Sequence, residues 1–497
     1  MKREGWLLTG LLVLALAIRL PHLVGNTIPF SFDHGRDSLA ALNIVKSHDL
    51  RFIGPWTSIP GLFFGPLWYW LLAGAFLFGG GHPLAGAGLM VALALVQVWL
   101  AQKFLGVYEA AIIAFAPLWL VVSTGAVNPF PMTLVGLVVV ILVKNIVKAG
   151  HASLKQIFAL TLTVGLGWHF SSALSLFYLV SLPAIFIFRK IKLSLKKVGW
   201  AFVGFLLPFV PQGLFELKHN FAEVRAVVDY FSRGESQKIN LGKIKLVTAS
   251  FLNELRLAVL PDQKFFYWLG LTVLIVGLVR AIKTSKGTRL WPEYLILTCL
   301  PLVGFWWLHY NPWYVYGLLP VAVAAAGDIL RQLPRALAVG YLALLVASSG
   351  ISLAGYLRAE KARLATNKAF LAAKMAAVDY VYQQAEGKPF SSYQYLPEIY
   401  DYAYQYLYIF NGFGGRSLPV EFSYQPGEIT YVPEKPQLLS KLPETSGAAE
   451  KIFLIIEKPE NIHHYPLSAW LERLPIGEVV SRQRLGPELE VWEATKQ

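Results

Sequence analysis

One apolar run decides the class of protein: Trp6-Leu-Leu-Thr-Gly-Leu-Leu-Val-Leu-Ala-Leu-Ala-Ile-Arg-Leu-Pro-His-Leu-Val24. A helix of about 20 apolar residues is long enough to cross the hydrocarbon core of a bilayer. The run is too long, and too poor in small residues at its end, for a cleaved signal peptide. It therefore predicts a membrane-spanning helix, with the basic residues Lys2 and Arg3 on its cytoplasmic side.

Ten further apolar runs follow, so we expect about eleven crossings and an all-α polytopic membrane protein. They are Leu84–Leu100, Val107–Thr124, Met132–Val147, Ile157–Trp168, Ser172–Phe188, Val198–Phe215, Phe265–Val279, Tyr294–Leu308, Trp313–Leu330 and Ala336–Tyr356. The composition agrees, because 55% of the residues are hydrophobic and only 15% are charged, whereas about 25% are charged in soluble domains. This excludes disordered and fibrous proteins and ordinary cytosolic enzymes. The net charge of +14 has a topological explanation, and no basic face suited to nucleic acid is visible.

One more apolar stretch, Leu62–Phe78, determines which side each later loop faces. If it does not cross, the Lys and Arg clusters of the connecting loops fall inside, and the short outer turns carry none. Those turns are Gly125–Pro131, His169–Ser171 and His309–Pro312. We therefore predict that Leu62–Phe78 lies in the outer interface, where its aromatic residues fit. The alternative is a twelfth full span.

Two domains follow from this topology. Residues 1–356 form a transmembrane module with long outer loops at 25–83 and 216–263, and residues 357–497 contain no run long enough to span. We expect the second part to be a soluble extracytoplasmic α/β domain. Its expected strands are Pro389–Tyr395, Glu428–Val432, Lys451–Glu457 and Glu488–Ala494, and its expected helices are Ala359–Gln384, Pro397–Phe410 and Ile462–Leu474. The tyrosine-rich run Tyr393–Tyr408 either binds sugar or packs on the membrane module.

The densest polar cluster follows the first span and reads Phe30-Ser-Phe-Asp33-His34-Gly35-Arg36-Asp37. Charged groups are costly at a membrane, so such a cluster indicates function. Two carboxylates, an imidazole and a guanidinium can bind a polar substrate and move a proton. We expect Asp33 to be catalytic. Asp37 is either a second catalytic group or a helix N-cap, because an apolar helical stretch follows it.

Other polar residues lie at the same outer level, including Asn128, His169, His309 and Glu216. Their common level suggests a shared outward cavity. A divalent metal held by Asp33, His34 and a distant histidine is conceivable, but no HxxxH or HExxH spacing occurs, so we expect no metal. The single cysteine, Cys299, excludes an internal disulfide framework.

These features resemble the polytopic glycosyltransferases with the GT-C fold that use polyprenyl-phosphate sugars, the group of the protein mannosyltransferases and aminoarabinose transferases. The likeness covers Trp6 to about Leu330. It rests on the acidic motif after the first span, on a helix ending Lys46-Ser-His-Asp-Leu50, and on Gly65-Pro-Leu-Trp-Tyr-Trp-Leu-Leu72. The family has adjacent Asp and Glu where this chain has Asp33 and His34, and a second acidic position where it has Asn128.

The resemblance implies an integral-membrane enzyme that transfers a hexosyl or pentosyl group from a polyprenyl-phosphate sugar, with inversion, to an acceptor protein, lipid or glycan outside the cell membrane. It implies Asp33 as the base and Asp37 as the reserve. We expect substrate to be bound by His34, Arg36, Asn128, His169, Arg225, Arg233 and His309, with the phosphate at an arginine or at His169. The alternative function is a lipid-linked glycan transporter or flippase, although no paired halves are apparent.

Overall fold

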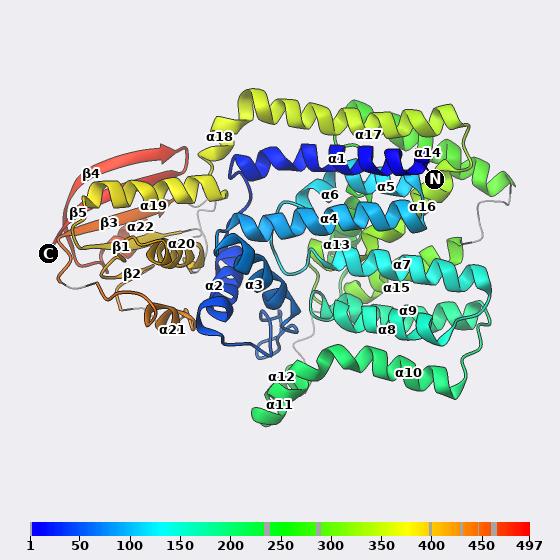
Figure 1. Cartoon of the computed structure of the whole chain (residues 1–497), viewed down its shortest axis with the longest axis horizontal. Helices are drawn as coiled ribbons and strands as arrows, with labels where there is room; N and C mark the ends of the chain where they lie inside the picture. The colour runs from blue at the N-terminus through cyan, green and yellow to red at the C-terminus, as the bar shows by residue number, and fades with distance from the viewer. Residues whose placement is uncertain are drawn as a thin grey trace.

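A bundle of long helices makes up most of the molecule, and a small sheet with its own helices caps one end (Figure 1). The computed structural model describes residues 2–232, 239–284, 290–396, 400–427, 431–445, 447–458 and 465–497. Seven helices in this part of the chain are long and apolar enough to cross a membrane. The helical membrane fold is therefore confirmed, while the count of eleven crossings stays a prediction.

The seven candidate spans each coincide with a predicted run. They are α1 (Lys2–Val24), α4 (Leu84–Phe104), α7 (Met132–Ala149), α10 (Leu195–Leu206) continued by η1 (Leu207–Phe209) and α11 (Val210–Lys218), α14 (Lys264–Thr284), η2 (Pro312–Leu318) with α16 (Leu319–Leu330), and α17 (Arg335–Gly355) continued by η3 (Tyr356–Glu360). Shorter helices lie among them, namely α8 (Leu154–Gly167), α9 (Ser172–Phe188) and α15 (Trp291–Trp307).

The run predicted as one span at Val107–Thr124 is broken into α5 (Val107–Phe115) and α6 (Pro117–Val122). Pro117 has no N–H, and Ala116 adopts an extended conformation, so the last carbonyls of α5 lose their helical partners. Arg19 of α1 donates to the carbonyls of Ala114 (3.0 Å) and Ile113 (3.4 Å) and to Ser123 Oγ (2.7 Å). Unpaired backbone groups are costly in a membrane. Arg19 is buried inside the bundle because its guanidinium supplies donors to the carbonyls that the break leaves unpaired.

Replacing Arg19 by methionine is therefore expected to destabilise the protein by about 2–6 kcal/mol, since two buried carbonyls lose their donor at about 1–3 kcal/mol each. The thermal unfolding midpoint in detergent measures this. Ser123→Ala is the matched control, because it removes a partner of Arg19 without freeing a carbonyl of the break, and its effect should be smaller. Equal midpoints for wild type and Arg19→Met would contradict this explanation.

Two short helices lie across the end of the bundle that faces the sheet (Figure 1). They are α2 (Phe32–Ser47) and α3 (Leu67–Gly79). At about 1.5 Å per residue, the 13 residues of α3 fall short of a hydrocarbon core about 30 Å thick. The interfacial position of Leu62–Phe78 nevertheless stays a prediction, because α8, which we expect to cross, has only 14 residues. The second long loop forms α12 (Ala222–Ser232) and α13 (Leu241–Leu257).

The C-terminal part is α/β, as predicted. Its five-stranded sheet has the order β2-β1-β3-β5-β4, in which β1, β2 and β3 are parallel and β5 is antiparallel to β3 and β4. The strands are β1 (Phe390–Tyr395), β2 (Phe422–Ser423), β3 (Lys451–Glu457), β4 (Ile476–Gly486) and β5 (Leu489–Lys496). The helices are α18 (Lys361–Ala365), α19 (Leu371–Ala385), α20 (Tyr402–Phe413), α21 (Lys435–Leu439) and α22 (Leu467–Leu471).

Several predictions for this part need correction. Strand β4 was not predicted, and the expected helix at 359–384 is two helices, α18 and α19. Residues 397–399, 428–430 and 462–464, which belong to three predicted elements, lie outside the described residues. Phe422–Ser423, rather than 431–432, supplies the edge strand beside β1.

Helix α20 holds the C-terminal part against the membrane module. Its tyrosines are buried, among them Tyr402, Tyr404, Tyr406 and Tyr408, so packing rather than sugar binding explains the tyrosine-rich run. Gly35 of α2 lies so close to the backbone of Ala403 that an added Cβ would be 2.3 Å from its nitrogen. The helix α2, which carries Asp33, therefore lies between α3 and α20.

Candidate functional site

Helix α2 begins after Ser31, which is its N-cap residue. The Ser31 backbone N–H donates to Nδ1 of His34 (3.3 Å), so the ring proton lies on Nε2, which is buried and has no partner. Burial lowers the pKa of His34 to about 4, and the imidazole is therefore neutral at physiological pH. Since Ser31 caps the helix, the interpretation of Asp37 as an N-cap is wrong.

Asp37 is instead the buried anchor of Arg36. Its Oδ1 accepts from Nε (2.9 Å) and Nη2 (2.8 Å) of Arg36, and its Oδ2 accepts from Nε1 of Trp68 (2.8 Å). Burial raises the pKa of Asp37 to about 6, although the adjacent guanidinium opposes this shift. A fully enclosed carboxylate with both oxygens occupied is suited to positioning Arg36 rather than to taking a proton from a substrate.

Asp33 differs from Asp37 in exposure. Its carboxylate lies 2.9 Å from Nη1 of Arg36, and its side chain is 55% exposed. Arg36 also lies over the ring of Trp56, at 5.4 Å from the centroid. The guanidinium is thus fixed from two sides, and one carboxylate beside it stays open to solvent and to a substrate.

Asp33 and Arg36 line a cavity of about 250 Å³ at the junction of α2, the loop before α3 and the turns at the ends of the spans. The other lining residues include Trp56, Thr57, Ser58, Phe64, Asn128, Asn311, Trp313 and Tyr314. Asn128 donates to the carbonyl of Phe170 (3.3 Å), while its Oδ1 is buried without a partner. The cavity therefore offers a carboxylate, a guanidinium and aromatic rings, with amide side chains in its wall, a set suited to a polar ligand.

A second, mainly apolar cavity of about 310 Å³ adjoins the first. The two share Thr57, Ser58, Phe64 and Tyr314 in their walls. The apolar cavity is also lined by His309, by Leu176 of α9, and by Val227 and Tyr230 of α12. A ligand with a polar head and an apolar tail could place the head beside Arg36 and the tail among these residues.

The loop that forms this shared wall is fixed by carboxylates of the second long loop. Glu223 accepts from the backbone N–H of Phe63 (2.9 Å), and Gln212 donates to the Phe63 carbonyl (3.2 Å). Glu216 accepts from the backbone N–H groups of Glu223 (3.0 Å) and Val224 at the start of α12. Burial raises the pKa of Glu223 to about 7.

Three of the predicted binding residues, His34, His169 and Arg225, do not line either cavity. His169 accepts from the N–H of Leu67 at Nδ1 (3.2 Å) and contacts the Pro208 carbonyl at Nε2 (3.1 Å), so it holds the start of α3. Burial lowers the pKa of His169 to about 4, which leaves it neutral and unsuited to bind a phosphate. Arg225 is exposed and donates to the His219 carbonyl. Arg233 lies outside the described residues.

The structure therefore brings together Asp33, Arg36 and Asn128, with His309 in the adjoining cavity and His34 buried behind the site. Sequence reasoning missed the wall formed by Trp56, Thr57 and Ser58. No signal in the sequence marks these residues, since they lie in an irregular loop. Within the described ranges, no group of three or more histidine, cysteine, aspartate or glutamate side chains could hold a metal ion.

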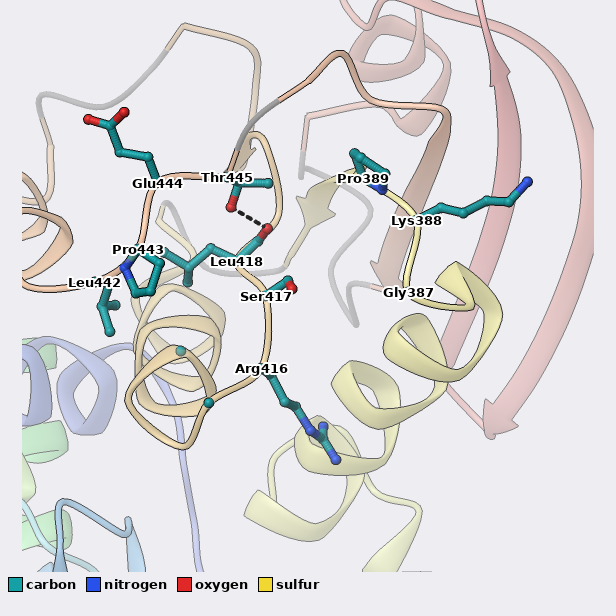
Figure 2. A pocket seen from close by; sticks show the side chains of 12 residues that line it. Gly387, Lys388, Pro389, Arg416, Ser417, Leu418, Leu442, Pro443, Glu444 and Thr445 are labelled. Carbon is teal, nitrogen blue, oxygen red and sulfur yellow. Dashed lines mark hydrogen bonds between the residues drawn. The ribbon is translucent and has the colours of Figure 1, made fainter.

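The C-terminal part has a cavity of its own, of about 270 Å³, between the end of α19 and the segment after α20 (Figure 2). Thr445 donates to the Leu418 carbonyl across it (2.9 Å). Lys388 and Arg416 extend away from these two residues (Figure 2), and Arg416 pairs with Asp379 (2.5 Å). Because its charged groups do not converge, this cavity is a weaker candidate than the one at Asp33.

Comparison with solved structures identifies the fold. The chain is similar to ArnT from Cupriavidus metallidurans bound to undecaprenyl phosphate, with a TM-score of 0.57, 14% identity and 98% coverage of both chains. The apo state of the same protein gives a TM-score of 0.55 and 17% identity, also with 98% coverage of both. The chain thus shares the fold of ArnT. Neither a protein-family model nor a curated protein matches the sequence.

Proposed function

We propose that this protein is an integral-membrane glycosyltransferase that moves a sugar from a polyprenyl-phosphate donor to an acceptor at the outer face of the membrane. One observation carries the proposal. Asp33, an open carboxylate, and Arg36, a fixed guanidinium, line a polar cavity that adjoins an apolar one. A lipid-phosphate sugar needs both environments at once, and the shared fold with ArnT, solved with undecaprenyl phosphate, supports this class of ligand.

In the proposed reaction, Asp33 takes the proton from an acceptor hydroxyl. The hydroxyl oxygen attacks the anomeric carbon of the sugar, and the bond from that carbon to the phosphate oxygen breaks. The polyprenyl phosphate leaves with the bonding electrons from the face opposite the attacking oxygen, so the configuration at the anomeric carbon inverts. Arg36 offsets the charge that develops on the phosphate, as a guanidinium held in place by Asp37 can do without reorganising.

The remaining sequence predictions complete the proposal. Asn128 borders the sugar in the wall of the polar cavity, and His309 contacts the lipid side of the ligand. Residues 1–356 form the transmembrane module, with eleven crossings and a cytoplasmic N-terminus. Residues 357–497 form the extracytoplasmic domain, whose helix α20 supports α2 from outside.

Ligand binding tests the proposal without knowledge of the sugar. Undecaprenyl phosphate should raise the thermal unfolding midpoint of the purified protein, and undecaprenol, which lacks the phosphate, should do so much less, since a ligand that binds only the folded state stabilises it. Equal effects of the two lipids would contradict a phosphate site beside Arg36.

The topology is tested by cysteine labelling from outside the cell. Single cysteines introduced near Gly81, after α3, and near Gly387, after α19, should both react with a membrane-impermeant maleimide in a Cys299→Ser background. A cysteine near Lys283, at the end of α14, should react only after the membrane is opened. Reaction at only one of the two outer positions would overturn the assignment of α3 as a helix that does not cross.

A further inference from the structure

A large apolar groove lies at the opposite end of the bundle from Asp33. It measures about 790 Å³ and is lined by α8, α9, α10 and the loop 189–194. Helix α10 packs along α8 at the outside of the bundle (Figure 1). Protein atoms therefore fill the space between α9 and α10 only in part. The volume of the groove falls in the range of small-molecule binding sites, which is about 300–1,000 Å³.

The walls of the groove suit a hydrocarbon chain. Leu182, Phe186 and Phe205 form part of the lining, together with the outward side chains Ile187 and Phe202. Ile187 is 78% exposed and Phe202 is 64% exposed within the protein alone. In a bilayer these side chains contact lipid rather than water. An acyl chain can therefore enter between them without removing water from any polar group.

The mouth of the groove is basic. Lys190 and Lys192 both line it, and both are exposed. No acidic side chain in the described part of the chain pairs with either lysine, whereas the neighbouring Arg189 pairs with Glu293. The turn that carries the lysines is fixed, because Lys190 has a φ of 54° and the N–H of Ile191 returns to the Phe186 carbonyl (2.8 Å).

Charge and position together select the occupant. The loop 189–194 lies at the same end of the bundle as the N-terminus (Figure 1), which we expect to face the cytoplasm. The cytoplasmic leaflet holds the anionic phospholipids to which clustered lysines bind. We propose that the groove is a binding site for one anionic phospholipid, with an acyl chain between α9 and α10 and the headgroup phosphate at Lys190 and Lys192.

Native mass spectrometry of the full-length protein tests this site. After delipidation in detergent, the protein is titrated with phosphatidylglycerol or with phosphatidylcholine of the same acyl chains. We expect one phosphatidylglycerol to bind about 25-fold more tightly than phosphatidylcholine, since each of the two lysines contributes about fivefold at a membrane surface. The double variant Lys190→Gln/Lys192→Gln should lose this preference. Lys103→Gln/Lys283→Gln removes the same charge from two exposed lysines outside the groove and should keep it.

A second variant separates the groove from the lysines. Ala201→Trp places a large side chain in the lining and should abolish tight binding of the phospholipid, while leaving the monodisperse size and the helix content of the protein unchanged. Equal affinity of the Lys190/Lys192 double variant and wild type for phosphatidylglycerol would overturn the proposal. So would displacement of the bound phosphatidylglycerol by undecaprenyl phosphate, because the groove would then belong to the donor lipid.

Discussion

Replacing Asp33 by asparagine is expected to lower turnover by about 10²–10⁴-fold, the usual effect of losing a general base. Asparagine has nearly the same shape but cannot take a proton from an acceptor hydroxyl. The fold should survive, because Asp33 is half-exposed and bonded only to Arg36 among the described residues. Sugar transfer measured at saturating donor, together with donor binding measured separately, distinguishes loss of the base from loss of affinity.

Asp37→Asn is the matched control, since it makes the same chemical change four residues away on the same helix. Asp37 is buried and holds Arg36 and Trp68. We therefore expect this variant to weaken donor binding more than it lowers turnover at saturation. Normal turnover in Asp33→Asn, with no turnover in Asp37→Asn, would assign the base to Asp37 instead.

Arg36→Ala is expected to weaken binding of the donor lipid by about 1–3 kcal/mol, the scale of a lost hydrogen bond to a charged group. The guanidinium lies in the polar cavity and is fixed by Asp37 and by the ring of Trp56. Binding of undecaprenyl phosphate, measured by titration in detergent, gives the affinity. Arg36→Lys keeps the positive charge but lacks the several N–H donors of a planar guanidinium. Its affinity for undecaprenyl phosphate should therefore lie between those of the alanine variant and wild type.

Arg225→Ala is the control for this experiment. Arg225 carries the same charge in the second outer loop, but it lines neither cavity and contacts the carbonyl of His219. Its loss should leave donor affinity unchanged. If Arg225→Ala weakens binding while Arg36→Ala does not, the phosphate lies in the outer loop rather than on α2.

Much of the fold could be predicted from sequence because a bilayer imposes a minimum length on every crossing. The seven long candidate spans each appear as one apolar run. The break at Ala116 could not be predicted in the same way, since Pro117 is compatible with a kinked span as well as with two helices. The partner that makes the break tolerable, Arg19, lies nearly a hundred residues earlier in the chain.

Strand β4 was missed for a related reason. Its residues are mostly exposed on both faces, so Ile476–Gly486 shows no alternation of apolar and polar residues. Among the described strands it pairs with β5 alone, at the edge of the sheet. Hydrophobic periodicity identifies strands that have one face on a core. An exposed edge strand such as β4 has no such face, so periodicity does not identify it.

At the site, Asp33 and Arg36 were expected from the sequence and line one cavity, but their surroundings were misassigned. A carboxylate before an apolar helical stretch is typical of an N-cap, yet the helix begins at Phe32, and Asp37 lies inside it. His169 looked like a ligand because it lies in an outer turn, whereas its two ring nitrogens bond to the backbone at Leu67 and Pro208. Both errors concern contacts between distant segments, which local sequence does not specify.

The central claim is that this protein breaks the bond between a sugar and a polyprenyl phosphate, and one measurement tests it most directly. Purified protein in proteoliposomes is given polyprenyl-phosphate sugars with an acceptor extract, and free polyprenyl phosphate is quantified by mass spectrometry. We expect wild type to release it catalytically and Asp33→Asn to release at least about 100-fold less. An intact donor that wild type moves across the bilayer would contradict the claim and indicate a flippase.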